Sequence, residues 1–382
     1  MESFIKNLSE VSIKDVSEVG GKNASLGEML QKLAPQGVSI PGGFVVTATA
    51  YRYFLQKSKI KNQNLGYFIK DTLRGLDTKN LFDLARRGKL IRETIKNAEF
   101  PEDLKKDIVR AYAEMEKQYG KNTDVAVRSS ATAEDLPGAS FAGEHETYLN
   151  IRGPEEVLKA VKSAMASLFT NRAISYRVDK GFDHFRVALS VGMQKMVRSD
   201  LSSSGVIFTL DTESGFKDVV LVNGSWGLGE MIVQGEVTPD EFLVFKKHLS
   251  NYSRIASNKS RIFEKDSRER IREGFEIFKP IISKKLGIKN RKMIYGEASA
   301  PGIKNTKIVL TSKKEKENFV LSDNEILKLA RWAALIEDHY SKKNKKWTPM
   351  DIEWAKDGKT KELFIVQARP ETIHADRDYS KI

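Results

Sequence analysis

Three strand-like segments in the middle of the chain constrain its fold most strongly. They are VALSVGMQKMV (187–197), GVIFTL (205–210) and DVVLVNGSW (218–226). Only a few residues separate one from the next, and this close spacing favours an antiparallel or mixed sheet. Helical patterns lie around this region: apolar residues recur at helical spacing over 154–169, and a second helix is predicted from Ser322, which forms a capping-box pattern with Glu325.

The composition sets broad limits on what the chain can do. With 382 residues, of which 40% are hydrophobic and 30% charged, it is long enough for one large lobe or two to three small ones. No apolar stretch approaches the roughly 18 residues that a membrane span needs, and the start MESFIKNLSE lacks a signal-peptide pattern, so we expect a cytoplasmic protein without membrane association. The absence of cysteine excludes disulfides, thiolate metal sites and cysteine nucleophiles.

The positive charge is concentrated in one segment. The net charge is +13, and residues 246–292 hold 15 Lys or Arg against 5 Asp or Glu, a net charge of +10. Because Ile and Phe interrupt these residues, we interpret the segment as a solvated helix face. A docking surface for an acidic partner, or a rim around a polyanionic ligand, is the alternative. No nucleic-acid-binding motif accompanies the charge, so we expect no nucleic-acid partner.

The last predicted element is a β-hairpin with a polar face. Its strands, MDIEW (350–354) and LFIVQAR (363–369), flank a loop that contains Asp357-Gly358. With a register symmetric about residue 360, the cross-strand pairs are Asp351 with Arg369 and Glu353 with Gln367. Since side chains alternate between the two faces of a strand, the opposite face carries Ile352, Trp354, Val366 and Ala368.

Such a polar face suits a metal ion and a phosphate. Mg²⁺ accepts one or two carboxylates and completes its coordination with waters and substrate phosphates, and a neighbouring arginine such as Arg369 binds phosphate in a bidentate manner. The alternative is an exposed hairpin whose cross-strand salt bridges contribute roughly 0.2 to 1 kcal/mol each.

A second phosphate-binding candidate precedes these strands. The stretch VAVRSSATAEDLPGASFAGEHET (125–147) joins a buried apolar run to a loop rich in small and hydroxyl-bearing residues, with Arg128 at the junction. Lys22 follows the pair Gly20-Gly21 and is expected at or near a helix N-terminus. Phosphoryl transfer needs such cations and backbone donors. Plainer interpretations are an exposed first-turn Lys22, an Arg128 tied to a carboxylate such as Glu134, and a simple turn at Gly143.

The common nucleotide-binding motifs are missing. GGKNAS lacks the upstream glycine of the P-loop, and WGLGEM is followed by Ile232 where the dinucleotide fingerprint requires glycine. The five histidines show no metal-ligand spacing. A chain like this one that binds ATP therefore does so with a different fold.

Seven longer motifs resemble the N-terminal nucleotide-binding domain of the phosphoenolpyruvate synthase and pyruvate phosphate dikinase family. They are VGGKNASLGEM, VAVRSSATAEDLPGASFAGEHETYLNI, LFTNRAISYR, MVRSDLSSSGVIFTLDTESGF, WGLGEMIVQGEVTPDEF, PMDIEWAKDG and LFIVQARPET. They span about residues 4–373, nearly the whole chain. Pyruvate phosphate dikinases and rifampicin phosphotransferases share the Arg-Ser and Gln-x-Arg elements, but DTESGF and VQGEVTPDEF are more similar to the synthases.

The resemblance implies an α+β, ATP-grasp-like fold that clamps ATP between two lobes, with Mg²⁺ bridging its phosphates. We expect one lobe over residues 1–200 and the other over 201–375. In the family, the β-phosphoryl group passes to a histidine on a swivelling domain, AMP and phosphate leave, and a C-terminal barrel phosphorylates pyruvate. The sum is ATP, pyruvate and water giving AMP, phosphoenolpyruvate and phosphate.

The resemblance also assigns roles to single residues. The phosphate contacts, and thus the catalytic residues, are Lys22 of GGKN, Arg128 of VRSS and Arg369 of VQAR. Further nucleotide contacts fall on Gly143 and Thr147 at the end of the loop and on Gln194, expected near the adenine. The metal positions are Glu353 and Gln367, with Asp351 beside them.

One part of the family pattern is absent from this chain. No histidine lies in a Thr-(Cys or Ser)-His-Ala context, and the chain stops at Ile382, before the swivelling and barrel domains. We therefore expect an excised domain, half of a split enzyme or a truncated product, whose phosphohistidine and pyruvate domains act in cis or in trans. Alternatives are the corresponding module of an antibiotic phosphotransferase and a non-catalytic nucleotide-binding module.

Overall fold

The computed structural model describes residues 3–60, 62–132, 147–249, 280–296 and 305–371. The chain forms two compact units. Unit 1 includes Met1–Gln36 and Ile40–Met196, and unit 2 includes Gly37–Ser39, Val197–Gly296 and Thr306–Ile382. Within the described residues, no helix is both long enough and apolar enough to cross a membrane.

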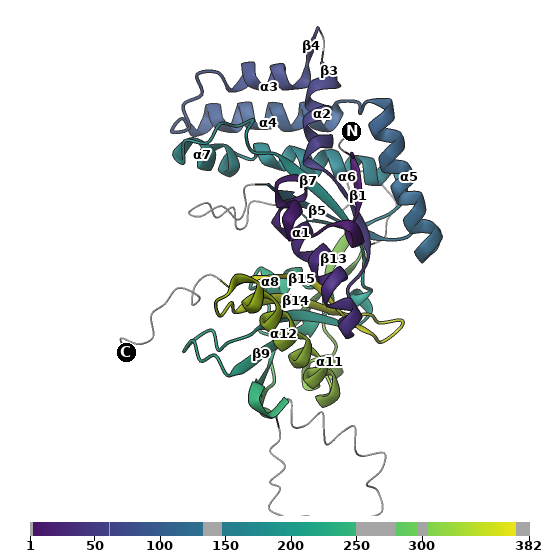
Figure 1. Ribbon diagram of the computed structural model, residues 1–382, viewed down its shortest axis with the longest axis vertical. Coiled ribbons are helices and arrows are strands. Elements are labelled where there is room, and N and C mark those ends of the chain that lie inside the picture. Colours follow the sequence, from purple (N-terminus) through teal and green to yellow (C-terminus); the bar gives the residue numbers. More distant parts are fainter. Residues whose placement is uncertain (1–2, 61, 133–146, 250–279, 297–304, 372–382) are drawn as a thin grey trace, which may run out of the picture. The chain divides into compact units, whose positions relative to one another are not determined.

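Unit 1 is built on a five-stranded antiparallel sheet (Figure 1). The strands lie in the order β1-β2-β7-β5-β6, and each neighbouring pair is antiparallel. Their bounds are Ile5–Asn7 (β1), Gly43–Val46 (β2), Leu189–Lys195 (β7), Val125–Ala131 (β5) and Thr147–Ile151 (β6). Six of the seven residues of the central strand β7 are buried, as expected for a strand covered on both faces. A separate pair of two-residue strands is formed by Lys59–Ile60 (β3) and Gln63–Asn64 (β4).

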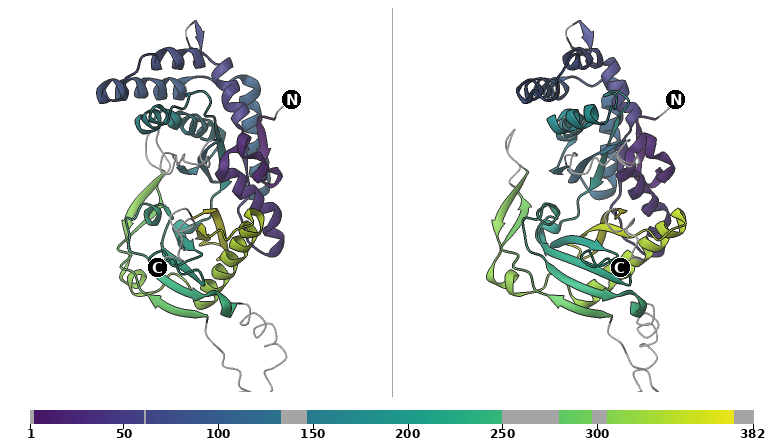
Figure 2. Two further views of the ribbon diagram at one scale, coloured as in Figure 1. Left: turned by 60° about the vertical axis from the view of Figure 1, so that its left-hand side comes forward. Right: turned by 90° about the vertical axis from the view of Figure 1, so that its left-hand side faces the viewer.

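The described part of unit 1 also contains seven α-helices. They are α1 (Val16–Lys32), α2 (Ala48–Lys57), α3 (Leu65–Leu73), α4 (Leu81–Asn97), α5 (Glu102–Tyr119), α6 (Pro154–Ala166) and α7 (Asn171–Asp179). The helix α6 confirms the prediction over 154–169, with Pro154 in its first turn. One sheet face, through Val127, Val191 and Met193, joins the main apolar core together with α2, α4, α5 and α6. Figure 2 shows α3 and α4 side by side at one end of this unit.

Unit 2 is built on a six-stranded antiparallel sheet in the order β11-β10-β9-β8-β14-β15. The bounds are Ile281–Lys285 (β11), Asp240–Phe245 (β10), Val219–Trp226 (β9), Ser203–Phe208 (β8), Met350–Lys356 (β14) and Leu363–Pro370 (β15). A two-stranded hairpin pairs Arg291–Tyr295 (β12) with Thr306–Leu310 (β13). Helices whose bounds lie within the described residues include α8 (Glu230–Val233), α11 (Lys313–Glu317) and α12 (Asp323–Asn344).

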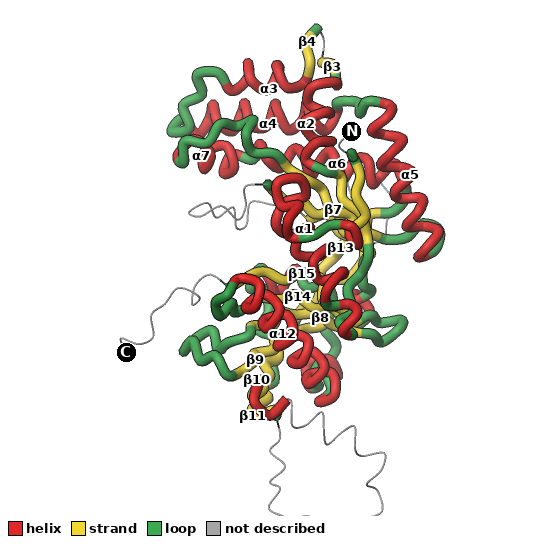
Figure 3. Tube along the Cα trace, viewed as in Figure 1, coloured by secondary structure: helices red, strands yellow, loops and turns green. Residues whose placement is uncertain are grey.

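Helix α12 covers one face of the unit 2 sheet (Figure 3). It contacts β8, β9, β10 and β14, and its Ile326, Leu329 and Ile336 are fully buried. The predicted capping box is confirmed, because the Ser322 amide donates to Glu325 Oε2 at 2.9 Å. On the sheet, residues facing α12 are fully buried and alternate with half-buried ones, as in VLVN of β9. The residues on the other face, such as Leu221 and Asn223 of β9, are half-buried.

The predicted combination of helices with antiparallel sheets is confirmed in both units. The three segments that constrained the prediction form β7, β8 and β9. They do not form one sheet, because β7 belongs to the sheet of unit 1 whereas β8 and β9 pair in unit 2. The closely spaced β8 and β9 pair antiparallel as predicted, but sequence spacing alone does not reveal that the chain passes from one unit to the next after Met196.

Candidate functional site

Lys22 lies one turn inside a helix that bends at Gly20. Helix α1 starts at Val16, but Gly20 has a non-helical backbone with φ 70° and ψ 165°, so a new helical segment begins just before Lys22. This agrees with the expectation of a lysine near a helix N-terminus. A Cβ at Gly20 would lie 2.3 Å from Ser130 Oγ, and the Lys22 amide donates to the same oxygen at 3.2 Å. Glycine is therefore required for the close approach of α1 to β5.

Buried polar side chains fix α1 against the sheet of unit 1. Asn23 Nδ2 donates to Ser190 Oγ at 3.0 Å, and Ser190 Oγ in turn donates to the Ser130 carbonyl at 3.2 Å. Gly192 leaves the space for Asn23, because a Cβ there would lie 2.2 Å from Asn23 Oδ1. No role was predicted for Asn23, Ser130 or Ser190 from the sequence. Their contacts link positions 60 to 167 residues apart, which no local pattern indicates.

Arg128, Thr147 and Gln194 share the sheet face that α1 covers. Arg128 on β5 pairs with Gly192 on β7 and with Thr147 on β6. Gln194 lies two residues beyond Gly192, so its side chain points to the same face. The structure thus places these three predicted residues and the Lys22 turn on one side of unit 1. Gly143 and Glu134 lie outside the described residues.

Gln194 is the most deeply buried of these side chains. It is 3% exposed, and its Nε2 has no hydrogen-bond partner among the described residues. Buried amides are normally hydrogen-bonded, so an orphaned donor calls for an explanation. A ligand acceptor beside Gln194 would supply the missing partner.

The hairpin of unit 2 has the predicted register at its polar end. Asp351 pairs with Arg369 and Glu353 with Gln367, as symmetry about residue 360 predicts. A bulge between Glu353 and Trp354 then shifts the pairing by one residue, so that Trp354 opposes Ile365.

One prediction about buried residues is wrong because of the bulge. Ile352, Trp354 and Ala368 are buried as expected, but Val366 is only half-buried and Ile365 is fully buried instead. Because of the one-residue shift, the part of β15 nearer the turn points Ile365, and not Val366, to the buried face. The four polar residues are unaffected, because they lie on the other side of the bulge.

The polar face contains an ion pair and a set of oxygen ligands. Arg369 Nε and Nη2 donate to Asp351 Oδ2 at 2.9 and 2.7 Å, so the salt bridge of the alternative interpretation is present. Two residues further along the same two strands, Glu353 pairs with Gln367. Among the described residues, no three His, Cys, Asp or Glu side chains are grouped closely enough to hold a metal unaided. Two carboxylates and an amide oxygen fit Mg²⁺ when phosphates and waters supply the remaining ligands.

Neighbouring strands extend this face with residues that the sequence analysis missed. Glu353 pairs with Val206 on β8, and Val206 pairs with Asn223 on β9. Asn223 Oδ1 is buried and has no hydrogen-bond partner in the described part of the chain. Beside it, Phe208 and Leu221 are half-buried and form an apolar surface. The alternation of β9 suggested which face Asn223 shares, but the pairing of β8 with β14 could not be predicted.

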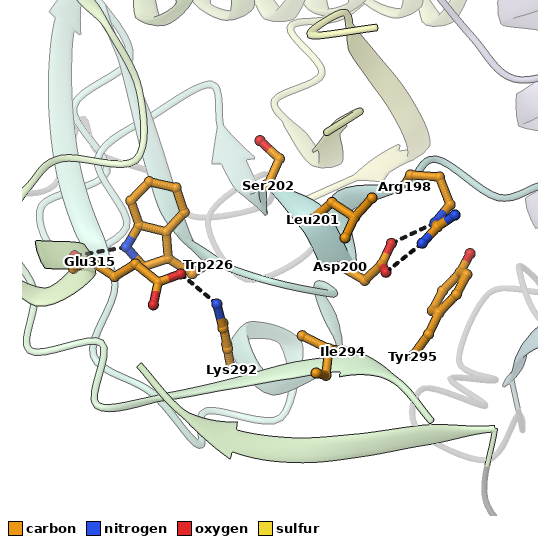
Figure 4. A pocket seen from close by; sticks show the side chains of 9 residues that line it. All are labelled: Arg198, Asp200, Leu201, Ser202, Trp226, Lys292, Ile294, Tyr295 and Glu315. Carbon is orange, nitrogen blue, oxygen red and sulfur yellow. Dashed lines mark hydrogen bonds and ion pairs between the residues drawn. The ribbon is translucent and has the colours of Figure 1, made fainter. Parts of the chain in front are cut away.

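The cavity in Figure 4 lies elsewhere in unit 2 and contains none of the predicted site residues. It has a volume of about 520 Å³ and is lined by Arg198, Asp200, Leu201, Ser202, Trp226, Lys292, Ile294, Tyr295 and Glu315. Arg198 donates to both carboxylate oxygens of Asp200 at 2.8 and 2.9 Å and lies 4.5 Å over the Tyr295 ring. A second ion pair joins Lys292 to Glu315. The two cations and the two carboxylates that line the cavity are therefore paired with one another. The cavity has no excess positive charge that would favour a polyphosphate.

Comparisons with known proteins agree on one family. Residues 16–382 match the family described as pyruvate phosphate dikinase, AMP/ATP-binding domain. The chain is 54% identical over 369 residues to the phosphoenolpyruvate synthase of Aquifex aeolicus, covering 96% of this chain and 39% of that protein. Identity to the phosphoenolpyruvate synthase of Synechocystis sp. is 50% over 378 residues, covering 98% and 42%. The chain is 46% identical over 367 residues to the phosphoenolpyruvate synthase of Escherichia coli, covering 96% of this chain and 42% of that protein.

These relatives are much longer than the chain. It spans about two fifths of the length of the curated relatives that it matches. The match to the family covers almost all of the chain, and it includes every predicted phosphate-contacting and metal-binding position. The chain therefore belongs to the pyruvate phosphate dikinase AMP/ATP-binding domain family.

Proposed function

We propose that the chain is the ATP-binding part of a phosphoenolpyruvate synthase. In this function it binds Mg²⁺-ATP and donates the β-phosphoryl group to a histidine on a domain outside the chain. Family membership and relatives named phosphoenolpyruvate synthase support the proposal. The observation that carries it is the hairpin register, in which Glu353 faces Gln367 and Asp351 faces Arg369.

The phosphate contacts are proposed as Lys22, Arg128 and Arg369. All three are cations, and their charge would offset the negative charge of the polyphosphate chain during transfer. Arg128 is half-buried on the sheet face that α1 covers, which limits its side chain to few orientations. Arg369 is more accessible, with 55% of its side chain exposed. It would exchange its bond to Asp351 for one to a phosphate.

The remaining nucleotide contacts are proposed on the same sheet face as Arg128. Thr147 is exposed at the start of β6. Gly143, which lies outside the described residues, is proposed as a further contact. Gln194 is proposed to contact the adenine. The buried Nε2 of Gln194 is suited to a ring nitrogen, which would supply its missing acceptor.

The metal ligands are proposed as Glu353 and Gln367, with Asp351 beside them. When bound, Mg²⁺ neutralises developing charge on the transferring phosphates. The residues of this chain hold and orient it: Glu353 and Gln367 are directly opposed on adjacent antiparallel strands, so their side chains are neighbours. The rigidity of a six-stranded sheet suits such positioning.

The complete reaction needs further domains. We propose that a phosphohistidine domain and a pyruvate-binding barrel domain act with this chain, in cis or in trans, in the cytoplasm. The greater length of the relatives supports such additional domains. Their printed names favour the synthase over an antibiotic phosphotransferase or a non-catalytic module.

Phosphoryl transfer tests the proposal directly. The chain is incubated with Mg²⁺, ATP labelled at the β-phosphate and a phosphohistidine domain prepared from the Aquifex aeolicus relative. The expected result is label on that domain together with AMP, both lost when Arg128 is changed to alanine. In a parallel reaction with an added rifamycin antibiotic, label on the antibiotic would favour the antibiotic phosphotransferase. ATP binding without any transfer would favour the non-catalytic module.

A further inference from the structure

A buried ion pair lies behind the start of β14. Lys246, directly after β10, donates from Nζ to Glu337 Oε1 and Oε2 at 2.8 and 2.6 Å. Glu337 comes from α12, and the side chains are only 15% and 11% exposed. Neither residue belongs to the proposed ATP site. Burial lowers the pKa of Lys246 from its usual value, and the Glu337 carboxylate opposes that shift.

The pair is connected to the polar hairpin through Thr209. Lys246 Nζ also donates to the Thr209 carbonyl at 2.6 Å. Thr209 in turn holds both backbone groups of Met350: the Met350 amide donates to Thr209 Oγ1 at 2.8 Å, and the Thr209 amide donates to the Met350 carbonyl at 3.1 Å. Met350 is the residue immediately before Asp351. A continuous chain of hydrogen bonds thus runs from Lys246 to the first residue of β14.

A second connection reaches the same segment from α12. Trp347 Nε1 donates to Glu337 Oε1 at 2.9 Å, three residues before Met350. One carboxylate therefore restrains the segment that leads into β14 at Trp347, and through Lys246 and Thr209 at Met350. Thr209 itself is fully buried. Hydrogen bonds in such an environment are stronger than in water and restrict alternative backbone positions.

Stability alone does not explain charges at this position. Burying an ammonium and a carboxylate costs solvation energy, and well-packed apolar residues are often as stabilising as a buried ion pair. Most side chains that α12 buries are apolar, with Ile326, Leu329 and Ile336 fully buried, and its other ion pair to β14, between Glu325 and Lys356, lies at the far end of that strand. The ion pair departs from that pattern where α12 and β10 meet the segment before Asp351. A directional restraint on the backbone is what a charged, multiply hydrogen-bonded group supplies and an apolar one does not.

We propose that Lys246 and Glu337, acting through Thr209, are positioning residues that fix the start of β14 and so aim Asp351 and Glu353 at the Mg²⁺ of bound ATP. This inference rests on the proposed function. Lys246 and Glu337 are not among the residues proposed to contact the metal or the nucleotide. They hold the backbone from which the two carboxylates project, in the way that outer partners orient metal ligands in other proteins.

The test uses the full chain and a matched pair of substitutions at Thr209. Thr209→Val removes the hydroxyl that accepts from Met350 with little change of shape, whereas Thr209→Ser keeps it. Lys246→Met combined with Glu337→Met removes both charges together, which avoids leaving one buried charge unpaired. Lys247→Met is the control. Lys247 follows Lys246 in the sequence and forms an ion pair with Asp218, but its side chain is 67% exposed.

Three quantities are measured for each variant. They are the melting temperature, the affinity for ATP with and without Mg²⁺, and amide hydrogen exchange over residues 347–353. In Thr209→Val and in the double variant we expect faster exchange and a Mg²⁺-dependent affinity reduced by about tenfold, with affinity in the absence of Mg²⁺ unchanged. Thr209→Ser and Lys247→Met should behave like the wild type in all three.

The outcomes separate this inference from the proposed function. Wild-type exchange and wild-type Mg²⁺ dependence in the two folded test variants would overturn it, as would equal losses of affinity with and without Mg²⁺. Where Thr209→Val does not fold, the double variant decides. A wild-type chain that binds no Mg²⁺-ATP would refute the proposed function. The exchange data would then still show whether Thr209 and the ion pair hold Met350, and unchanged exchange would overturn that as well.

Discussion

Arg369 donates to Asp351 from two nitrogens, Nε and Nη2, and both hydrogen bonds reach the same carboxylate oxygen, Oδ2. The pairing leaves the Arg369 side chain 55% exposed and the Asp351 side chain 17% exposed. A cross-strand ion pair this accessible contributes little to stability, typically about 0.2 to 1 kcal/mol. The arginine can therefore exchange this partner for a phosphate at small cost, which connects the hairpin with the proposed reaction.

Replacing Arg369 should affect binding much more than folding. For Arg369→Ala we expect the free energy of unfolding to change by less than about 1 kcal/mol, because the pair is exposed. The affinity for Mg²⁺-ATP should fall about ten- to a hundredfold, since a charge-assisted hydrogen bond contributes roughly 1.5 to 3 kcal/mol. Urea unfolding and calorimetry measure the two effects. Arg74→Ala, which breaks an exposed helical pair with Asp71, is the control and should change neither.

Gly20 should be intolerant of any side chain. Any other residue at this position would be strained by the φ of +70°, and its Cβ would lie 2.3 Å from Ser130 Oγ. Gly37 also has a positive φ, +90°, but no atom within 4 Å of a Cβ. We therefore expect Gly20→Ala to cost roughly 1 to 3 kcal/mol more than Gly37→Ala, the usual range for overpacking. Thermal or urea unfolding measures the difference. Equal costs would mean that backbone strain alone matters and that the contact with Ser130 relaxes freely.

His184 should make the chain sensitive to mild acid. Burial and the nearby Arg177 lower the pKa of His184 from 6.5 to about 4, and Arg177 Nε donates to His184 Nδ1 at 2.9 Å. The folded state therefore prefers neutral histidine. Its stabilising contribution is complete above pH 6.5, the ordinary pKa, and decreases as the pH falls towards 4.

A glutamine substitution isolates this contribution. His184→Gln keeps a hydrogen-bond acceptor for Arg177 but removes the titration. Urea midpoints are compared between pH 7 and 4, where the wild type should lose stability more steeply than the variant. Because carboxylates titrate in both proteins, only the difference reports on His184. Parallel curves would show that His184 protonates in the folded state without cost.

The parts of the site that depend on local sequence were predictable. The predicted hairpin register, symmetric about residue 360 between MDIEW and VQAR, gave the correct cross-strand partners for all four polar residues. The capping box at Ser322 and the helix after Pro154 were also confirmed, because each depends on residues a few positions apart. The resemblance to the family was confirmed by the match over residues 16–382.

The parts that depend on distant strands were not predictable. Asn223 shares a face with Glu353 only because β8 lies between β9 and β14, a strand order that no spacing in the sequence indicates. The bulge after Glu353 moved Ile365 into the position expected for Val366. The contact of Gly20 with Ser130 and the hydrogen bond from Lys246 to Thr209 likewise join residues that are adjacent only after folding.

Calorimetric titration of the full chain with ATP, with and without Mg²⁺, tests the central claim most directly. The wild type should show saturable binding that strengthens with Mg²⁺. Glu353→Ala should lose that strengthening while its melting temperature stays close to wild type, because Glu353 is half-buried on the polar face of the sheet. Mg²⁺-dependent binding that is identical in the wild type and in Glu353→Ala would contradict the metal assignment, and the absence of binding to the wild type would contradict the function proposed for the chain.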